Sequence, residues 1–242
     1  TQRKMASIDL LQGDCLTAER YLQDSANLLQ QRDQYEYART CVDLCWLYSI
    51  QGQLEQAYEW INKGFSVAER IENRYLQMLC KSGKGHLYRQ MRLWEDAKEE
   101  FSAALKDAVE LEDLREQGWI KLGIGRVEYF ISIHYLQQGN KAEAALLIDR
   151  AFKNLREAEG LFFQTQYHYR YELALALIGK LLLDAHVKDC LTSQITTYTQ
   201  DLICSHHETD TQYTLTDVFG LVKTLYENAL SGFSKMKSGY YI

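Results

Sequence analysis

The stretch that decides the fold is Tyr48–Phe65, with the sequence YSIQGQLEQAYEWINKGF. It reads as the end of one helix, a glycine stop and a second, amphipathic helix. Gly52 is expected to end the first helix, because a residue without a Cβ adopts the left-handed conformation at least cost. Ala57 and Gly64 are small, lie seven residues apart on one helix face, and allow a neighbouring helix to approach closely. The stretch predicts an antiparallel helical hairpin.

The same arrangement recurs along the chain. Around Ala57, Ala97 and Ala144 an aromatic residue lies nine positions before this small anchor residue, a bulky residue four after it and a second small residue seven after it. A glycine lies five positions before Ala18, Ala57 and Ala144, and Ala18 has the bulky and small residues after it but not the aromatic residue before it. The anchors are Ala18, Ala57, Ala97 and Ala144, with a weaker copy at Cys190. Their spacings are 39, 40, 47 and 46 residues. In the copy at Ala97 the glycine five positions before the anchor is replaced by Arg92. Each hairpin is apolar on one side and must stack on a neighbour, so the sequence predicts an array.

These offsets resemble the tetratricopeptide repeat, most clearly from about residue 8 to residue 155. The terminal proline of that family is absent, and its Trp-Leu-Gly opening is reduced to Leu44-Cys45 and Lys84-Gly85. Repeats of about 40 residues are similar to those in the sensor region of MalT-like transcription activators and in scaffold proteins of the Leu-Gly-Asn type. The resemblance implies an all-α fold, a right-handed superhelix (α-solenoid) of antiparallel helix pairs.

The pattern predicts one continuous domain over residues 1–242, because no Ser/Gly-rich linker divides the chain. Helices are expected at 14–32, 35–51, 53–71, 74–91, 93–110, 113–138, 141–158, 161–184, 186–204 and, as a C-terminal cap, 212–233. Asn140 with Glu143 is expected to form a capping box, and Asp14 to cap the first copy. We expect the chain, which opens on Thr1, to be a piece of a larger protein.

Composition excludes several classes. The net charge of −6 argues against bulk attraction to nucleic acid or anionic lipid, and no apolar run reaches the length of a membrane span. The absence of proline favours an uninterrupted succession of helices. Six cysteines fall mostly at apolar helix positions, which predicts reduced thiols and a cytoplasmic location.

No stretch carries a catalytic or metal-binding signature. Gly83-Lys84-Gly85 lacks the remainder of a phosphate loop, and Cys204–Glu208 lacks a second ligand pair for zinc. No nucleophile has a recognisable motif around it. The sequence therefore predicts no enzyme activity, cofactor or metal. The aromatic run Tyr167–Tyr171 is read as core packing, with a partner surface as the alternative.

By resemblance to the family, a ligand lies on the concave wall formed by the first helix of each pair. The expected groove residues are Arg39, Trp46, Ser49, His86, Arg89, Gln90, Arg126 and Tyr129. Arginines beside aromatic residues suit an extended peptide that carries carboxylates. They equally suit a sugar stacked on an aromatic ring, and the alternative is that these are solvated helix faces.

Three functions are left open. The first is a non-catalytic protein- or peptide-binding scaffold or regulatory module, with a partner that carries acidic groups. The second is the ligand-sensing segment of a larger signalling protein, such as a MalT-like regulatory ATPase, with a small-molecule ligand. The third is a receptor for quorum-sensing peptides. An enzyme is the weakest reading, and neither a membrane nor nucleic acid is expected as a partner.

Overall fold

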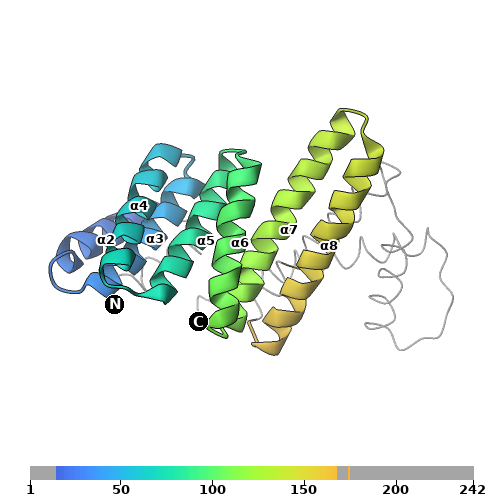
Figure 1. The fold of residues 1–242 in the computed structure, drawn as a ribbon. Helices are drawn as coiled ribbons and strands as arrows, with labels where there is room; N and C mark the ends of the chain where they lie inside the picture. The colour runs from blue at the N-terminus through green and yellow to red at the C-terminus, as the bar shows by residue number, and fades with distance from the viewer. Residues whose placement is uncertain (1–14, 168–173, 175–242) are drawn as a thin grey trace, which may run out of the picture. The chain divides into compact units, whose positions relative to one another are not determined.

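A computed structural model describes residues 15–167 and residue 174. The chain divides into two compact units, residues 1–116 and 117–242, and each is described by itself. The helices are α2 (Cys15–Leu29), α3 (Gln34–Ile50), α4 (Leu54–Arg70), α5 (Arg74–Gln90), α6 (Trp94–Glu110), α7 (Leu114–Gln137) and α8 (Lys141–Gln164) (Figure 1). The described ranges contain no strand, which confirms the predicted all-α class. The arrangement of helix pairs is that of an α-solenoid, and a single domain over residues 1–242 stays a prediction.

The helices repeat with a fixed register. Helices α3, α5 and α7 begin at residues 34, 74 and 114, so the repeat is 40 residues long. Each of α3 to α6 has 17 residues, whereas α7 and α8 have 24, which is two helical turns more. The extra turns of α7 account for the longer spacing from Ala97 to Ala144. The anchor at Cys190 and the predicted cap at 212–233 lie outside the described residues.

One turn geometry ends every helix from α3 to α8. The backbone is left-handed at Gly52 (φ 77°) and Gly139 (φ 80°), as predicted, and also at Arg92 (φ 62°) and Glu72 (φ 53°). The residue after each of these four closes a hydrogen bond back over the last helical turn, as in the 2.9 Å bond from Gln53 N–H to the Tyr48 carbonyl. Arg92 and Glu72 therefore adopt a conformation that suits glycine, at a steric cost.

The first testable prediction concerns these turns. Arg92→Gly and Glu72→Gly should each raise the free energy of unfolding by about 0.5–1 kcal/mol, because the left-handed penalty exceeds the extra chain entropy of glycine. Gly52→Ala should lower it by about 1 kcal/mol. Urea denaturation followed by circular dichroism measures all three. A loss of stability on introducing either glycine would show that the turn does not hold this geometry in solution.

The predicted packing positions are buried. The anchors Ala18, Ala57, Ala97 and Ala144 are all 0% exposed. Tyr48, the aromatic residue nine before Ala57, is 2% exposed, and its hydroxyl donates a 3.0 Å hydrogen bond to Glu19 Oε1 in α2. A Cβ on Gly64 would lie 2.9 Å from Cys41 Cβ and 3.2 Å from the Ala38 carbonyl oxygen. Small residues at these positions therefore do permit close helix approach.

Two local predictions were wrong. The side chain of Asn140 makes no capping hydrogen bond, so the predicted capping box is absent. Side-chain caps occur instead where one hairpin follows another, at Asp33, Asn73 and Asp113, which accept from backbone N–H groups at 3.0 Å. The break predicted between 158 and 161 is also absent, because α8 continues through Gly160 to Gln164. The predicted cap Asp14 and the predicted helices beyond residue 167 lie outside the described residues.

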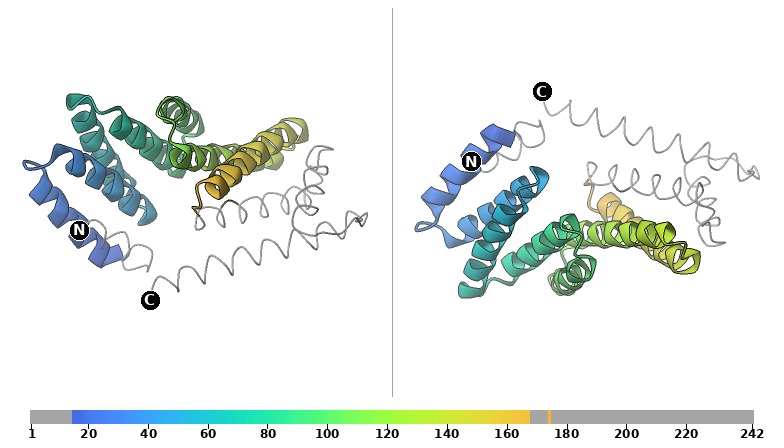
Figure 2. Two further views of the ribbon diagram at one scale, coloured as in Figure 1. Left: turned by 90° about the horizontal axis from the view of Figure 1, so that it is seen from below. Right: turned by 90° about the horizontal axis from the view of Figure 1, so that it is seen from above.

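The first unit has an inner and an outer row of helices (Figure 2). Helix α3 packs directly against α5 as well as against its own partner α4. The helices α4 and α6 have at most marginal contact with each other, as do α2 and α4. Helices on the inner side of a curved array lie closer together than those on its outer side. We therefore assign α3 and α5, which touch, to the inner row of this unit, and α2, α4 and α6 to the outer row. This is the arrangement expected of a repeat array in which the first helices line a concave wall.

Candidate functional site

A single stripe of α3 carries two of the accessible predicted site residues, Arg39 and Trp46. Tyr35, Arg39, Val42, Trp46 and Ile50 follow one another at intervals of four, three, four and four residues, so they share one helix face. Trp46 is 37% exposed and Ile50 is 50% exposed, while the other three are half-buried. We call these five residues the α3 stripe. It combines two aromatic rings, one cation and two aliphatic side chains.

Arg39 lies at the junction of α3 and α5. Its guanidinium carbon is 5.8 Å from the centre of the Tyr35 ring, and a 4.0 Å ion pair joins it to Glu36. Its charge also acts on Tyr75 of α5: burial and the Glu116 carboxylate raise the pKa of that phenol, and Arg39 opposes the rise. Arg39 Nε has no hydrogen-bond acceptor among the described residues. The cation therefore lies over one phenol ring, acts electrostatically on a second and is only weakly neutralised.

The other predicted residues of the first unit are mostly packed. Ser49 is 9% exposed, and its hydroxyl donates a 2.7 Å hydrogen bond to the Cys45 carbonyl. His86 is 6% exposed and meets the Phe101 ring edge-on, with 4.9 Å between ring centres. Arg89 is 8% exposed, whereas Gln90 is exposed. The structure brings Arg39 and Trp46 together on an accessible face and encloses Ser49, His86 and Arg89.

Arg126 and Tyr129 belong to the second unit. Both lie on α7 and are half-buried. The Tyr129 ring is 5.5 Å from the Phe130 ring, and its carbonyl accepts a 2.7 Å hydrogen bond from Ser132. A role for all eight predicted residues in one groove stays a prediction.

Sequence reasoning missed two tyrosines, Tyr35 and Tyr75. They stand 40 residues apart. Tyr35 lies four residues, about one helical turn, before Arg39, and Tyr75 lies at the equivalent position of the next repeat. Their recurrence at the repeat period was the signal that could have revealed them. Together with Arg39 they place aromatic surface on both inner helices.

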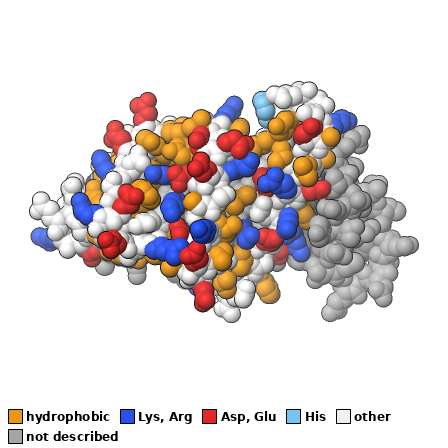
Figure 3. Space-filling model, viewed as in Figure 1, with side chains coloured by type: hydrophobic (Ala, Val, Ile, Leu, Met, Phe, Trp, Pro, Cys, Tyr) orange, Lys and Arg blue, Asp and Glu red, His pale blue; other side chains and the backbone are white. Residues whose placement is uncertain are grey.

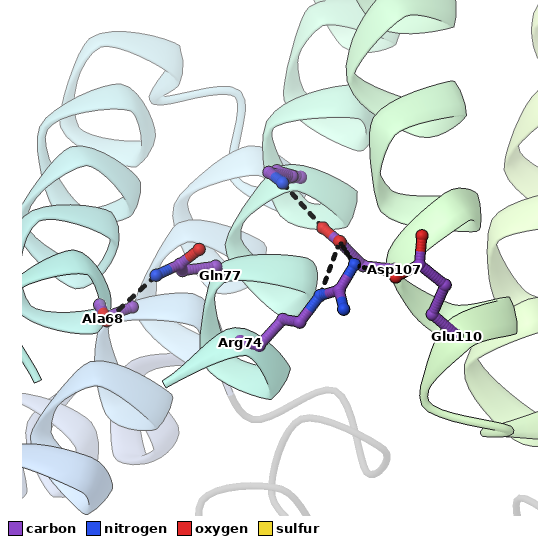
Figure 4. Close-up of polar contacts among 6 residues, drawn as sticks. Ala68, Arg74, Gln77, Asp107 and Glu110 are labelled. Atoms are coloured by element: carbon purple, nitrogen blue, oxygen red, sulfur yellow. Dashed lines mark hydrogen bonds and ion pairs between the residues drawn. The ribbon is translucent and has the colours of Figure 1, made fainter. Parts of the chain in front are cut away.

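The α5–α6 hairpin carries a polar network that serves structure rather than binding (Figure 4). The Asp107 carboxylate accepts hydrogen bonds from Arg74 Nε at 3.1 Å, Arg74 Nη2 at 3.0 Å and Lys81 Nζ at 2.6 Å. Arg74 also pairs with Glu110. Burial acts to raise the pKa of Asp107, but the bonds from Lys81 and Arg74 outweigh it and lower that pKa. Asp107 is thus held ionised between the two helices.

A second prediction follows from Asp107. Asp107→Asn should cost about 1–2 kcal/mol of unfolding free energy near neutral pH, because two cations lose a hydrogen-bonded carboxylate. The folded pKa is lowered, so this stabilisation is present above the unfolded pKa of about 3.9 and is lost as pH falls through the folded value. The stability difference between variant and wild type, measured by urea denaturation, should therefore shrink below about pH 4. A difference that does not depend on pH would contradict the assignment. Glu95→Gln, at an exposed i,i+3 pair, is the control.

The second unit has a buried ion pair of its own. Glu128 of α7 is 1% exposed and receives Arg150 Nη2 at 2.9 Å and Asn154 Nδ2 at 2.8 Å, both from α8. Lys121 and Glu157 form a further pair between the same helices. These contacts fasten the two long helices to each other.

Three of the four described cysteines are buried. Burial raises the pKa of the Cys41, Cys45 and Cys80 thiols to about 12, so their thiolates are scarcely populated near neutral pH. Within residues 15–167, no group of His, Cys, Asp and Glu side chains is placed to hold a metal ion. No helix in that range combines the length and apolarity needed to cross a membrane. The segment Cys204–Glu208 lies outside the described residues.

Charges are mixed on the face drawn in Figure 3. Acidic and basic side chains alternate there, with hydrophobic side chains between them. No broad patch of one sign appears on that face of the described part. Any ligand attracted to this face must therefore be recognised by local groups rather than by a bulk field.

Comparison with known proteins shows the fold. No family model and no curated protein matches the chain. The crystal structure of BtubC (BKLC) from P. vanneervenii is similar, with a TM-score of 0.55 and 15% identity over 96% of this chain and 92% of that one. A Signal Transduction ATPase with Numerous Domains (STAND) protein with a tetratricopeptide repeat sensor, from Pyrococcus horikoshii, is similar with a TM-score of 0.51 and 14% identity. The match covers 99% of this chain and 42% of the STAND chain. These likenesses support a helical-repeat fold.

Proposed function

We propose that this chain is a non-catalytic binding module, and that its α3 stripe takes an extended peptide segment carrying a carboxylate. The observation that carries the proposal is Arg39. It lies over the Tyr35 ring and acts electrostatically on Tyr75, and its one ion pair with a described residue is the 4.0 Å contact to Glu36. A peptide carboxylate would give the guanidinium the planar, two-bond partner that it lacks.

The remainder of the stripe supplies apolar contact area. Trp46 and Ile50 are large, accessible and one helical turn apart. Aromatic and arginine side chains contribute most of the affinity at protein interfaces, because they combine a large contact area with directed polar groups. We therefore expect the peptide to carry an acidic residue followed by an apolar one along the direction of α3.

The test is a selection of peptides from a random display library, followed by affinity measurements on the enriched sequence. Arg39→Gln and Trp46→Ala should each weaken the binding at least tenfold, which is about 1.4 kcal/mol. Lys106→Gln, an exposed cation on the outer helix α6, should leave the affinity within twofold. Enrichment of peptides without acidic residues, or equal affinities in all three variants, would refute the proposal.

A second candidate function is ligand sensing within a larger signalling protein. The likeness to a STAND protein with a tetratricopeptide repeat sensor favours considering it, since the present chain spans 42% of that protein. In this reading Trp46 stacks against the face of a sugar or another small ring. A thermal-shift screen of sugars in which Trp46→Ala abolishes a hit that Arg39→Gln retains would support it over the peptide.

A further inference from the structure

We infer a second binding site, on the outer side of the first hairpin, which takes an acidic peptide segment of a partner protein. A groove of about 570 Å³ opens there between α3, α4 and Gln30 in the turn after α2. Its lining includes Tyr37, Glu59, Lys63, Val67 and Arg70. We call it the outer groove. Tyr37 stands nine residues before Trp46, half a helical rotation away, so this groove and the α3 stripe lie on opposite faces of α3.

The first hairpin, which lines the groove, lacks the ion network of the second. Equivalent positions are 40 residues apart: Gln34 and Arg74, Cys41 and Lys81, Val67 and Asp107, Arg70 and Glu110. In the second hairpin these positions hold the Asp107 network, with a carboxylate between two cations (Figure 4). In the first hairpin Val67 replaces that carboxylate and a thiol replaces Lys81. The first hairpin therefore has no carboxylate at the position that Asp107 occupies in the second.

The groove carries cations that lack carboxylate partners. Arg70 hydrogen bonds to the neutral Gln34 amide, and Lys63 Nζ lies 4.4 Å from the centre of the Trp60 ring. Neither forms an ion pair with a described residue. Glu59 is the one acidic residue in the lining, so the cations outnumber it. Charge complementarity therefore favours an acidic occupant.

The spacing of the two cations suggests the form of that occupant. Lys63 and Arg70 are seven residues apart, which places them on one side of α4 about 10 Å apart along its axis. A segment in the polyproline II conformation brings residues i and i+3 to the same side about 9 Å apart. Two glutamates at this spacing can each meet one cation, and an apolar residue between them can pack on Val67 and the Tyr37 ring.

The test uses the fluorescently labelled peptide Ala-Glu-Pro-Leu-Glu-Ala, blocked at both ends, and its counterpart with both glutamates replaced by glutamine. We expect the glutamate peptide to bind the full chain with a dissociation constant below 1 mM and the glutamine peptide to bind at least tenfold more weakly. Lys63→Glu and Arg70→Glu should each weaken binding at least tenfold. Lys106→Glu, a like change on the outer side of α6, should leave it within twofold. Absence of binding to the wild type would overturn the inference.

Two further variants identify the site itself. Val67→Asp places a carboxylate where the second hairpin has Asp107, so it should compete with the peptide and weaken its binding at least tenfold while circular dichroism confirms the helical fold. Because the α3 stripe is itself proposed to take an acidic peptide, the measurement is repeated in an Arg39→Gln/Trp46→Ala background, where binding to the outer groove should persist and should still be lost on Lys63→Glu. If Trp46→Ala and Arg39→Gln abolish binding while Lys63→Glu does not, the peptide occupies the α3 stripe. That outcome overturns the second site and leaves the proposed function standing.

Discussion

Gly64→Val should lower the free energy of unfolding by about 3 kcal/mol or more. The hydrogen at Gly64 faces Cys41 Cβ and the Ala38 carbonyl, and a Cβ would lie 2.9 and 3.2 Å from them. The second of these neighbours is backbone, which cannot rotate away, so α3 and α4 would have to separate along their contact. Overpacking of a rigid core costs 1–3 kcal/mol, and a branched side chain adds a second clash.

Gly160→Ala is the matched control for Gly64. Gly160 lies inside α8 and a Cβ there would have nothing within 4 Å. Because alanine is the better helix former, this variant should be more stable by up to about 1 kcal/mol. Urea denaturation followed by circular dichroism should therefore show opposite signs for the two substitutions. Equal effects at both glycines would mean that helix propensity, and not close approach, governs Gly64.

Phe101→Ala should cost about 3–5 kcal/mol. The ring is 0% exposed, packs on the position of Gly85 and meets the edge of His86. A Cβ on Gly85 would lie 2.8 Å from two carbons of this ring, so Gly85→Ala alone is also destabilising. In Phe101→Ala the ring is gone, so the added cost of Gly85→Ala should largely vanish.

A double-mutant cycle at Phe101 and Gly85 measures this coupling directly. Additive losses of unfolding free energy would show that the two positions do not touch. Phe163→Ala is the control for loss of a phenyl ring, because Phe163 is 71% exposed. It should change the unfolding free energy by less than about 0.5 kcal/mol.

The repeat was predictable because the same few steric requirements recur at fixed offsets. Ala57 must be small and Tyr48 must fill the angle between two helices, and these demands are visible in sequence. The left-handed turn at Arg92 was harder to predict, because arginine rarely adopts a positive φ. The surrounding structure, including the hydrogen bond from Leu93 N–H to the Tyr88 carbonyl, holds it there. The break predicted between 158 and 161 is absent because an isolated glycine such as Gly160 is tolerated inside a long helix.

The candidate sites were only partly predictable. Arg39 and Trp46 were found because the position of an inward-facing stripe follows from the anchor. His86 and Arg89 occupy positions of the same kind, yet they are buried, and the packing that encloses them cannot be read from a single helix. The outer groove was missed because its uncompensated cations stand out only when Val67 and Cys41 are compared with their equivalents, Asp107 and Lys81. That comparison becomes meaningful only once the partners of Asp107 are known.

The most direct test of the central claim is to map a selected acidic peptide by NMR on isotopically labelled protein. The account predicts that the largest shifts occur at the Trp46 indole N–H and the Arg39 Nε–H, with further shifts at Tyr35 and Tyr75. Shifts confined to the outer helices α4 and α6, with the Trp46 and Arg39 signals unmoved at saturation, would contradict a binding site on the α3 stripe.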